Sequence, residues 1–167
     1  MESVNTDHDP NCSYCTKPET LKAVMQEVME LPASTVYLWK DGRYPGRCVV
    51  ALKGHCRELF ALEPARRQQF MDDVSAVAAA IQQGFQPDKI NYAVFGDAVP
   101  HLHFHLVPKR RGGPEWGLPF VVNPSEPAPM SAEQTQSCLN LLRARLGCQE
   151  KAFPCAGEAK FSEPAKS

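Results

Sequence analysis

Apolar residues recur at helical spacing in two segments of the first half of the chain. Between residues 17 and 31 they fall three or four positions apart, which predicts one amphipathic helix after Pro18. A second and clearer helix is predicted to begin at Glu63-Pro64 and to end near Gly84, with its apolar residues on one face. Both segments are therefore expected to be helical along their whole length.

Four other segments are rich in β-branched and apolar residues, which favour strands. Residues 35–39 and 47–53 are separated by a longer polar loop and predict one antiparallel pair. Residues 89–95 and 101–108 predict a second pair, joined by a turn. The order helix, hairpin, helix, hairpin predicts an α+β fold in which a mainly antiparallel sheet of about five strands packs with two to three helices.

The last third of the chain starts irregular and returns to a helical pattern near its end. Its first part is rich in glycine and proline and is not expected to form regular structure. Ser131 and Gln134 then make a capping-box pattern, which predicts a helix over about 131–146. We predict one domain over residues 1–147 and a poorly ordered tail over residues 148–167.

Composition limits the kind of partner. The 167 residues carry a formal net charge of −1 with mixed signs, so no broad basic surface for nucleic acid is expected and a small-molecule partner is favoured. No signal peptide is evident, and no apolar run approaches the ~20 residues that a membrane helix needs. We therefore expect a cytoplasmic protein, whose seven cysteines are thiols or metal ligands.

The most distinctive candidate chemistry is the alternation of His101, His103 and His105 with apolar residues. On a strand these three rings project from one face, about 7 Å apart. They can hold a catalytic metal, although the first and third lie ~13 Å apart, so at most two neighbours can share one ion. Alternatively, one imidazole attacks phosphorus directly while its neighbours bind phosphate oxygens.

The segment from His101 to Val107 matches all seven positions of the His-φ-His-φ-His-φ-φ signature, where φ is apolar, and so resembles the histidine triad family. The resemblance covers about residues 12–120 and includes the landmarks Tyr44 to Val50 and Leu52 to His55. Glu115-Trp116-Gly117 resembles bacterial members similar to diadenosine polyphosphate hydrolases. The resemblance implies the family's α+β fold and a homodimer.

The resemblance also implies a mechanism. His103 would attack the α-phosphorus of a nucleotide and form a covalent nucleotidyl-histidine, which water cleaves to release a nucleoside monophosphate. The backbone carbonyl of His101 would orient His103, and His105 would contact phosphate oxygens or the leaving group. Members that transfer the nucleotide to another phosphate tend to carry Gln at the third position, so His105 favours hydrolysis. The implied substrates are dinucleoside polyphosphates or nucleoside phosphoramidates, with no organic cofactor.

Two alternatives to this activity stay open. One is a nucleotide-binding regulatory module that keeps the fold and the pocket but turns over slowly. The other is a metal-dependent hydrolase, with the metal on His101 and His103.

The pair Cys12-x-x-Cys15 is a weak signal by itself and fits a redox pair or two ordinary thiols. Some histidine triad relatives use two early cysteines, a middle histidine and the first histidine of the motif. By that resemblance Cys12, Cys15, His55 and His101 would form a closed structural zinc site.

Four further residues are candidates for substrate binding. Asp41 lies where relatives place a ribose-binding residue, or it is an exposed turn residue. Asn91 resembles a polar pocket residue, and Trp116 either stacks on a second base or fixes its own loop. Asp97 stands where the resemblance leads us to expect Asn or Gln, four residues before the triad. An ionised carboxylate at this position would repel a phosphate oxygen, whereas a neutral amide can donate to it.

Overall fold

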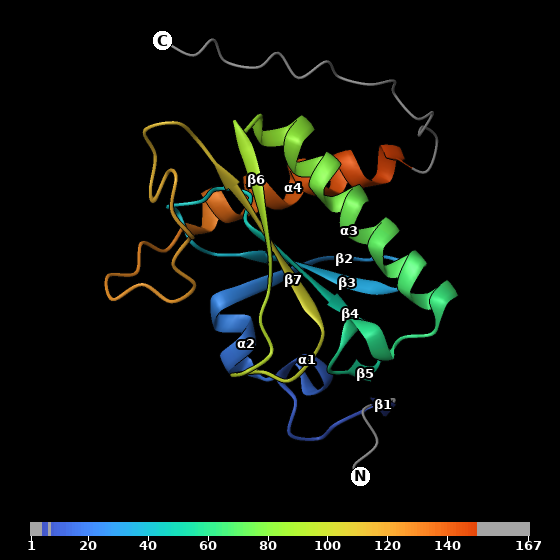
Figure 1. Ribbon diagram of the computed structural model, residues 1–167. Helices are drawn as coiled ribbons and strands as arrows, with labels where there is room; N and C mark the ends of the chain where they lie inside the picture. The colour runs from blue at the N-terminus through green and yellow to red at the C-terminus, as the bar shows by residue number, and fades with distance from the viewer. Residues whose placement is uncertain (1–4, 7, 150–167) are drawn as a thin grey trace, which may run out of the picture.

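The computed structural model describes residues 5, 6 and 8–149 and is built on one five-stranded antiparallel sheet (Figure 1). The strands lie in the order β2-β3-β4-β7-β6. Their bounds are Met25–Glu30 for β2, Ser34–Trp39 for β3, Cys48–Leu52 for β4, Lys89–Val94 for β6 and His103–Lys109 for β7. A separate pair joins β1, Asn5–Thr6, to β5, His55–Cys56. The predicted α+β class is confirmed.

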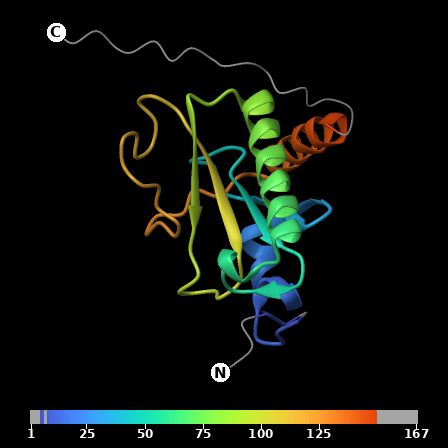
Figure 2. The ribbon, with the colours of Figure 1, turned by 45° about the vertical axis from the view of Figure 1, so that its right-hand side comes forward.

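Helices cover both faces of the sheet. They are α1, Ser13–Thr16; α2, Glu19–Val24; α3, Pro64–Phe85; and α4, Ala132–Gln149, with a 3-10 turn at Leu59–Ala61. The long helices α3 and α4 pack on one face, and the short α1 and α2 lie against the other (Figures 1 and 2). The chain therefore has its large apolar core on one side of the sheet and a thinner layer on the other.

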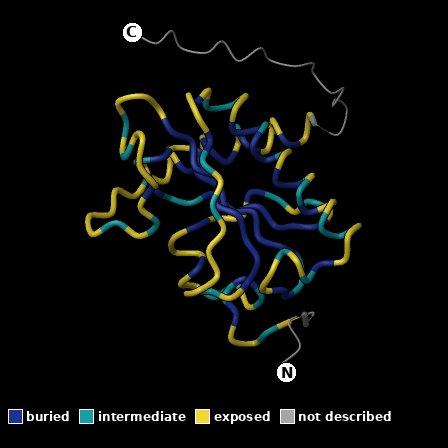
Figure 3. The backbone as a smooth tube through the Cα atoms, viewed as in Figure 1, coloured by how far each residue is buried: buried dark blue, intermediate teal, exposed yellow. Residues whose placement is uncertain are grey.

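Alternate residues of strand β7 face these two layers. Phe104 and Leu106 face the core formed with α3 and α4, whereas His103 and His105 face the opposite side. All seven residues of β7 are buried, and Figure 3 shows the central strands as the most buried part of the chain. His103 and His105 therefore belong to a buried central strand rather than to a loop.

The helix predicted over residues 17–31 is wrong in its second half. The helix α2 ends at Val24, and residues from Met25 onward form the edge strand β2, which pairs with β3. Met25 and Val28 are both buried although they lie three apart, because Met25 packs with α1 and α2 on one face of the sheet and Val28 packs in the α3 and α4 core on the other. A strand that is buried on both faces thus imitates helical spacing.

The C-terminal helix agrees with the prediction at its start. The Ser131 hydroxyl accepts from the Gln134 N–H, and the Ser131 N–H donates to the Gln134 side chain, which is the capping box. The helix continues past the predicted end to Gln149, and Gly147 does not adopt the positive φ with which a glycine ends many helices. The remainder of the tail predicted over residues 148–167 lies outside the described residues.

Among residues 5, 6 and 8–149, none of the helices is long and apolar enough to span a membrane.

Candidate active site and metal centre

His103 is held at the start of β7 with one ring nitrogen fixed. Its Nδ1 lies 2.6 Å from the backbone carbonyl oxygen of His101. A carbonyl can only accept a hydrogen bond, so Nδ1 carries the proton and Nε2 keeps a free lone pair. The ring packs against Tyr14 of α1, with ring centroids 4.8 Å apart. The geometry therefore presents His103 as a neutral nucleophile with a defined tautomer.

His101 lies just before β7 and not within it, which differs from the predicted strand over 101–108. The backbone N–H of Leu102 donates to Cys56, and the Leu102 carbonyl accepts from Leu52. These bonds take the place of strand pairing with β6 at Leu102, because β6 ends at Val94. The His101 ring turns away from the other two and donates from Nε2 to the Leu52 carbonyl at 2.9 Å.

His103 and His105 open onto a cavity of about 460 Å³. Its walls come from α1, α2, the end of β3 and the segments around Asp97 and Asn123. Trp39 packs against His105 with ring centroids 5.7 Å apart, and Phe95 does so at the same distance. The cavity combines aromatic walls with a few polar groups, which suits a nucleotide-sized ligand.

Burial keeps the three histidines neutral near pH 7. It lowers the pKa of His101 to about 4, with smaller contributions from His55 and His103. It lowers the pKa of His105 to about 3, with added effects of His103 and Arg47, and it also lowers the pKa of His103. A neutral imidazole at position 103 is the form that can attack phosphorus.

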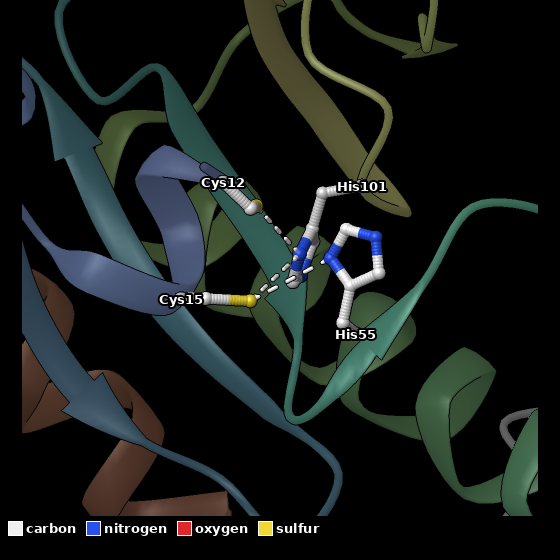
Figure 4. A group of neighbouring side chains, drawn as sticks. All are labelled: Cys12, Cys15, His55 and His101. Carbon is white, nitrogen blue, oxygen red and sulfur yellow. Dashed lines mark hydrogen bonds between the residues drawn. The ribbon is translucent and has the colours of Figure 1, made fainter. Parts of the chain in front are cut away.

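The second group of side chains consists of Cys12, Cys15, His55 and His101, whose ligand atoms all lie within 4.8 Å of one another (Figure 4). The two cysteines come from α1 and its N-terminal flank, His55 from β5 and His101 from the turn before β7.

The donor atoms of this group fit zinc. The Nδ1 atom of His101 lies 3.3 Å from Cys12 Sγ and 3.8 Å from Cys15 Sγ, and His55 Nδ1 lies 3.6 Å from Cys15 Sγ. A tetrahedron with zinc bonds of about 2.3 Å to sulfur and about 2.0 Å to nitrogen has S···N edges of about 3.5 Å. All four residues are buried or half-buried. A closed Cys2His2 set of this kind is typical of a structural metal site.

The structure brings only some of the predicted substrate residues to the histidine cavity. Asp97 lines it. Asn91 and Trp116 line a second cavity of about 530 Å³ over β6, and Phe95 forms part of both walls. Arg111 lies over the Trp116 ring, 5.3 Å from its centroid.

Asp41 is not an exposed turn residue. It is buried, and its carboxylate accepts from Arg43 at 2.9 Å and lies 3.6 Å from Arg47. Because both oxygens face guanidinium groups, the pKa of Asp41 is lowered despite its burial.

Sequence reasoning missed several residues that contact the triad, among them Tyr14 and Arg47. Tyr14 packs on both His101 and His103. Arg47 reaches His105, because Val49 pairs with His105 and a residue two positions earlier faces the same side. The sequence signal for Arg47 is its position two residues before Val49, which places both side chains on the same face of the strand.

Comparisons with known proteins agree with this architecture. The family model described as HIT domain matches residues 20–112. A histidine triad protein from Bradyrhizobium japonicum is 28% identical with a TM-score of 0.70, covering 77% of this chain and 96% of that chain. A histidine triad protein from Marinobacter aquaeolei is also 28% identical with a TM-score of 0.70, covering 78% and 95%.

A zinc-bound histidine triad family protein from Mycobacterium smegmatis shares the fold at 22% identity and a TM-score of 0.59, covering 86% of this chain and 98% of that chain. A comparison with curated proteins gave no significant match. The matched family model spans more than half of the chain and includes the three histidines. The chain belongs to the HIT domain family.

Proposed function

We propose that the protein hydrolyses nucleotides through a covalent nucleotidyl-histidine on His103, acting on dinucleoside polyphosphates or nucleoside phosphoramidates. The observation that carries this proposal is the 2.6 Å bond from His103 Nδ1 to the His101 carbonyl. It leaves the Nε2 lone pair of a buried, neutral imidazole beside a cavity of about 460 Å³. Family membership supports the same chemistry.

The reaction divides into two displacements at the α-phosphorus. His103 Nε2 forms a bond to phosphorus while the bond to the leaving group breaks, and the imidazole becomes positively charged with its Nδ1–H still bonded to the carbonyl. Water then attacks the same phosphorus, the P–N bond breaks, and the water proton leaves to solvent. His105 donates to a phosphate oxygen and stabilises the charge that develops there.

We further propose that Cys12, Cys15, His55 and His101 hold zinc and that no organic cofactor takes part. Bound zinc would supply a structural cross-link rather than a Lewis acid, since all four ligands come from the protein. The alternative metal on His101 and His103 is not supported, because His101 Nδ1 faces the cysteines and His103 Nδ1 faces a carbonyl.

The second cavity supports a substrate with two aromatic ends, as in the diadenosine polyphosphates. Phe95 lines both cavities, so a polyphosphate chain passing this residue would place one nucleoside beside Trp39 and the other beside Trp116 and Asn91. This arrangement is why we favour the diadenosine polyphosphate hydrolase-like subtype.

A homodimer in a reducing, cytoplasmic compartment completes the proposal. The edge strand β6 exposes Tyr92 and Val94, a surface that a second copy can cover. Cysteine ligands must stay reduced to bind zinc, which favours a reducing compartment. Sedimentation equilibrium tests the dimer, and a monomer at micromolar concentration would contradict it.

The test compares the wild type with His103→Ala on diadenosine tetraphosphate and on adenosine phosphoramidate. We expect adenosine monophosphate from the wild type and a loss of at least about 10³-fold in the variant, because the nucleophile is gone. Quenching in alkaline denaturant, in which the P–N bond of a nucleotidyl-histidine survives, with labelled substrate should trap a protein-bound nucleotide in the wild type only. Glu126→Ala, an exposed change outside both cavities, serves as the matched control.

Two outcomes would replace the proposal. Tight nucleotide binding without turnover by the wild type would indicate a regulatory binding module. Wild-type activity that chelators abolish, with no protein-bound nucleotide trapped, would indicate a metal-dependent hydrolase.

A further inference from the structure

Arg47 is a fully buried cation placed directly behind His105. Its side chain is 0% exposed, and its Nη2 lies 3.4 Å from His105 Nδ1. A guanidinium group can only donate hydrogen bonds. His105 Nδ1 must therefore accept, which places the ring proton of His105 on Nε2, at the opposite edge of the ring.

The surroundings of Arg47 fix the guanidinium in this position. Its Cζ atom lies 4.1 Å from the centroid of the Trp39 ring. Its Nη1 donates to the Val122 carbonyl at 3.3 Å, and a carboxylate oxygen of Asp41 lies 3.6 Å from the same Nη1 atom. Burial lowers the pKa of Arg47 to about 10, which still leaves it charged near pH 7. Because Asp41 is itself held by Arg43, the support extends over two further side chains.

A second proton on His105 conflicts with this arrangement. It would place an N–H against the N–H of Arg47 and a positive charge beside a buried positive charge. His105 can donate a hydrogen bond through Nε2–H, but it cannot become the imidazolium that serves as a general acid.

Other groups around the cavity offer little replacement. Among the described residues that line it, the remaining ionisable side chains are Tyr14 and Asp97. Burial raises the pKa of Tyr14, which makes its hydroxyl a poor acid. Asp97 is exposed at the rim of the cavity.

We propose that Arg47 is a positioning residue that holds His105 as a neutral Nε2–H donor, and that the enzyme therefore prefers phosphoanhydrides to phosphoramidates. This inference rests on the proposed function and narrows its substrate class. In a phosphoanhydride the P–O bond breaks and the leaving phosphate departs as a stable anion, so no proton is needed. In a phosphoramidate the P–N bond breaks and the amine must gain a proton, which His105 cannot supply.

The position of the proton is tested first in the wild type, so no variant needs to fold. Nitrogen NMR of the histidine rings at pH 7 should show His105 with an unprotonated Nδ1 and a protonated Nε2. In Arg47→Met the ring should exchange between tautomers and take up a second proton at higher pH than in the wild type, and Arg47→Lys should restore part of the wild-type pattern. An Nδ1–H tautomer or an imidazolium in the wild type at pH 7 would overturn the proposal.

The substrate preference is tested with adenosine monophosphate esters of phenols of graded acidity, alongside diadenosine tetraphosphate and adenosine phosphoramidate. Without a general acid, kcat/KM should rise steeply with the acidity of the leaving group, and the anhydride should be preferred by about 10²-fold or more. Arg47→Met should flatten this dependence, which a loss of stability alone would not do.

The outcomes separate this inference from the proposed function. Efficient cleavage of both substrates, with the phosphoramidate as fast as the anhydride, overturns the preference and leaves the nucleophile in place. If that cleavage is lost in Asp97→Asn, the proton comes from Asp97 and the preference is equally overturned. No turnover of any substrate by the wild type overturns the proposed function and the preference together, while the NMR result still decides the role of Arg47.

Discussion

Backbone carbonyls and one arginine give each histidine of the triad a different set of free atoms. His101 and His103 each donate to a carbonyl, but from opposite ring nitrogens. His105 faces Arg47 and accepts instead. These partners are specified by hydrogen-bond chemistry alone, so three identical side chains on one short segment acquire three roles.

Asp73 is the buried carboxylate that ties α3 to the start of β3. One of its oxygens accepts from the Ala33 N–H at 2.9 Å and from the Ser34 hydroxyl at 2.7 Å. Burial nevertheless raises the pKa of Asp73 above its ordinary value of 3.8, so the folded state holds the proton more tightly than the unfolded state.

We predict that the stability of the wild type relative to Asp73→Asn declines as pH rises from about 3.8 through the raised pKa. A raised pKa contributes stability below the unfolded pKa, and that contribution is lost as the group ionises. Urea unfolding of both proteins between pH 3 and pH 7 measures the difference. A difference that grows in favour of the wild type over this range would contradict the assignment.

At the scale of elements, α1 is too short to be stable alone and depends on what its cysteines bind. It spans only Ser13–Thr16, and its N-cap is Cys12, without a side-chain capping bond. The proposed zinc would fasten this turn to β5 and to the turn before β7.

We predict that Cys15→Ala loses one bound zinc per chain and lowers the stability by about 3 kcal/mol when the metal is present at a hundred times its dissociation constant. Hydrogen exchange should quicken in residues 13–16 first. Metal analysis and thermal unfolding measure both effects. Cys138→Ala, a buried cysteine of α4 remote from the cluster, should keep its zinc. Full zinc content in Cys15→Ala would rule out the site.

Elements with a single periodicity were predictable from the sequence, and the edge strand was not. The long helix α3 and the pairs β3–β4 and β6–β7 follow their patterns closely. The pattern of strand β2 was misleading because helices cover both faces of the sheet, so Met25 is buried on one face and Val28 on the other. Arg47 was missed because a charged residue beside an apolar strand normally marks an exposed strand end. Only the tertiary packing buries its side chain.

For the whole molecule, the sheet keeps the stabilising core and the candidate site on opposite faces. Leu139 and Leu142 of α4 are fully buried in the core with α3, and the histidine cavity lies across the sheet. Stability and chemistry are therefore separable by mutation to a degree that a shared core would not allow.

We predict that Leu139→Ala lowers the free energy of unfolding by about 2–5 kcal/mol, through lost burial and a cavity, and leaves kcat/KM within about twofold below the melting transition. Urea unfolding and steady-state kinetics at low temperature test the two parts. Phe60→Ala, at a position that is 79% exposed and lines neither cavity, should change neither quantity appreciably. A large loss of kcat/KM in Leu139→Ala while it is still folded would show that the two faces are coupled.

The alternation along β7 also constrains how this chain can change in length. Insertion or deletion of one residue within His103–Lys109 would reverse the faces of all strand residues on one side of the change, so the histidines and the core residues could not all keep their places. Chemistry and folding would fail together, so such changes cannot accumulate there. The irregular segments on either side of β7, which carry Asp97 and Trp116, have no side-chain alternation that a change in length would reverse. Proteins of this fold can therefore change what they bind by altering the length of these loops, while the number of residues in β7 stays constant.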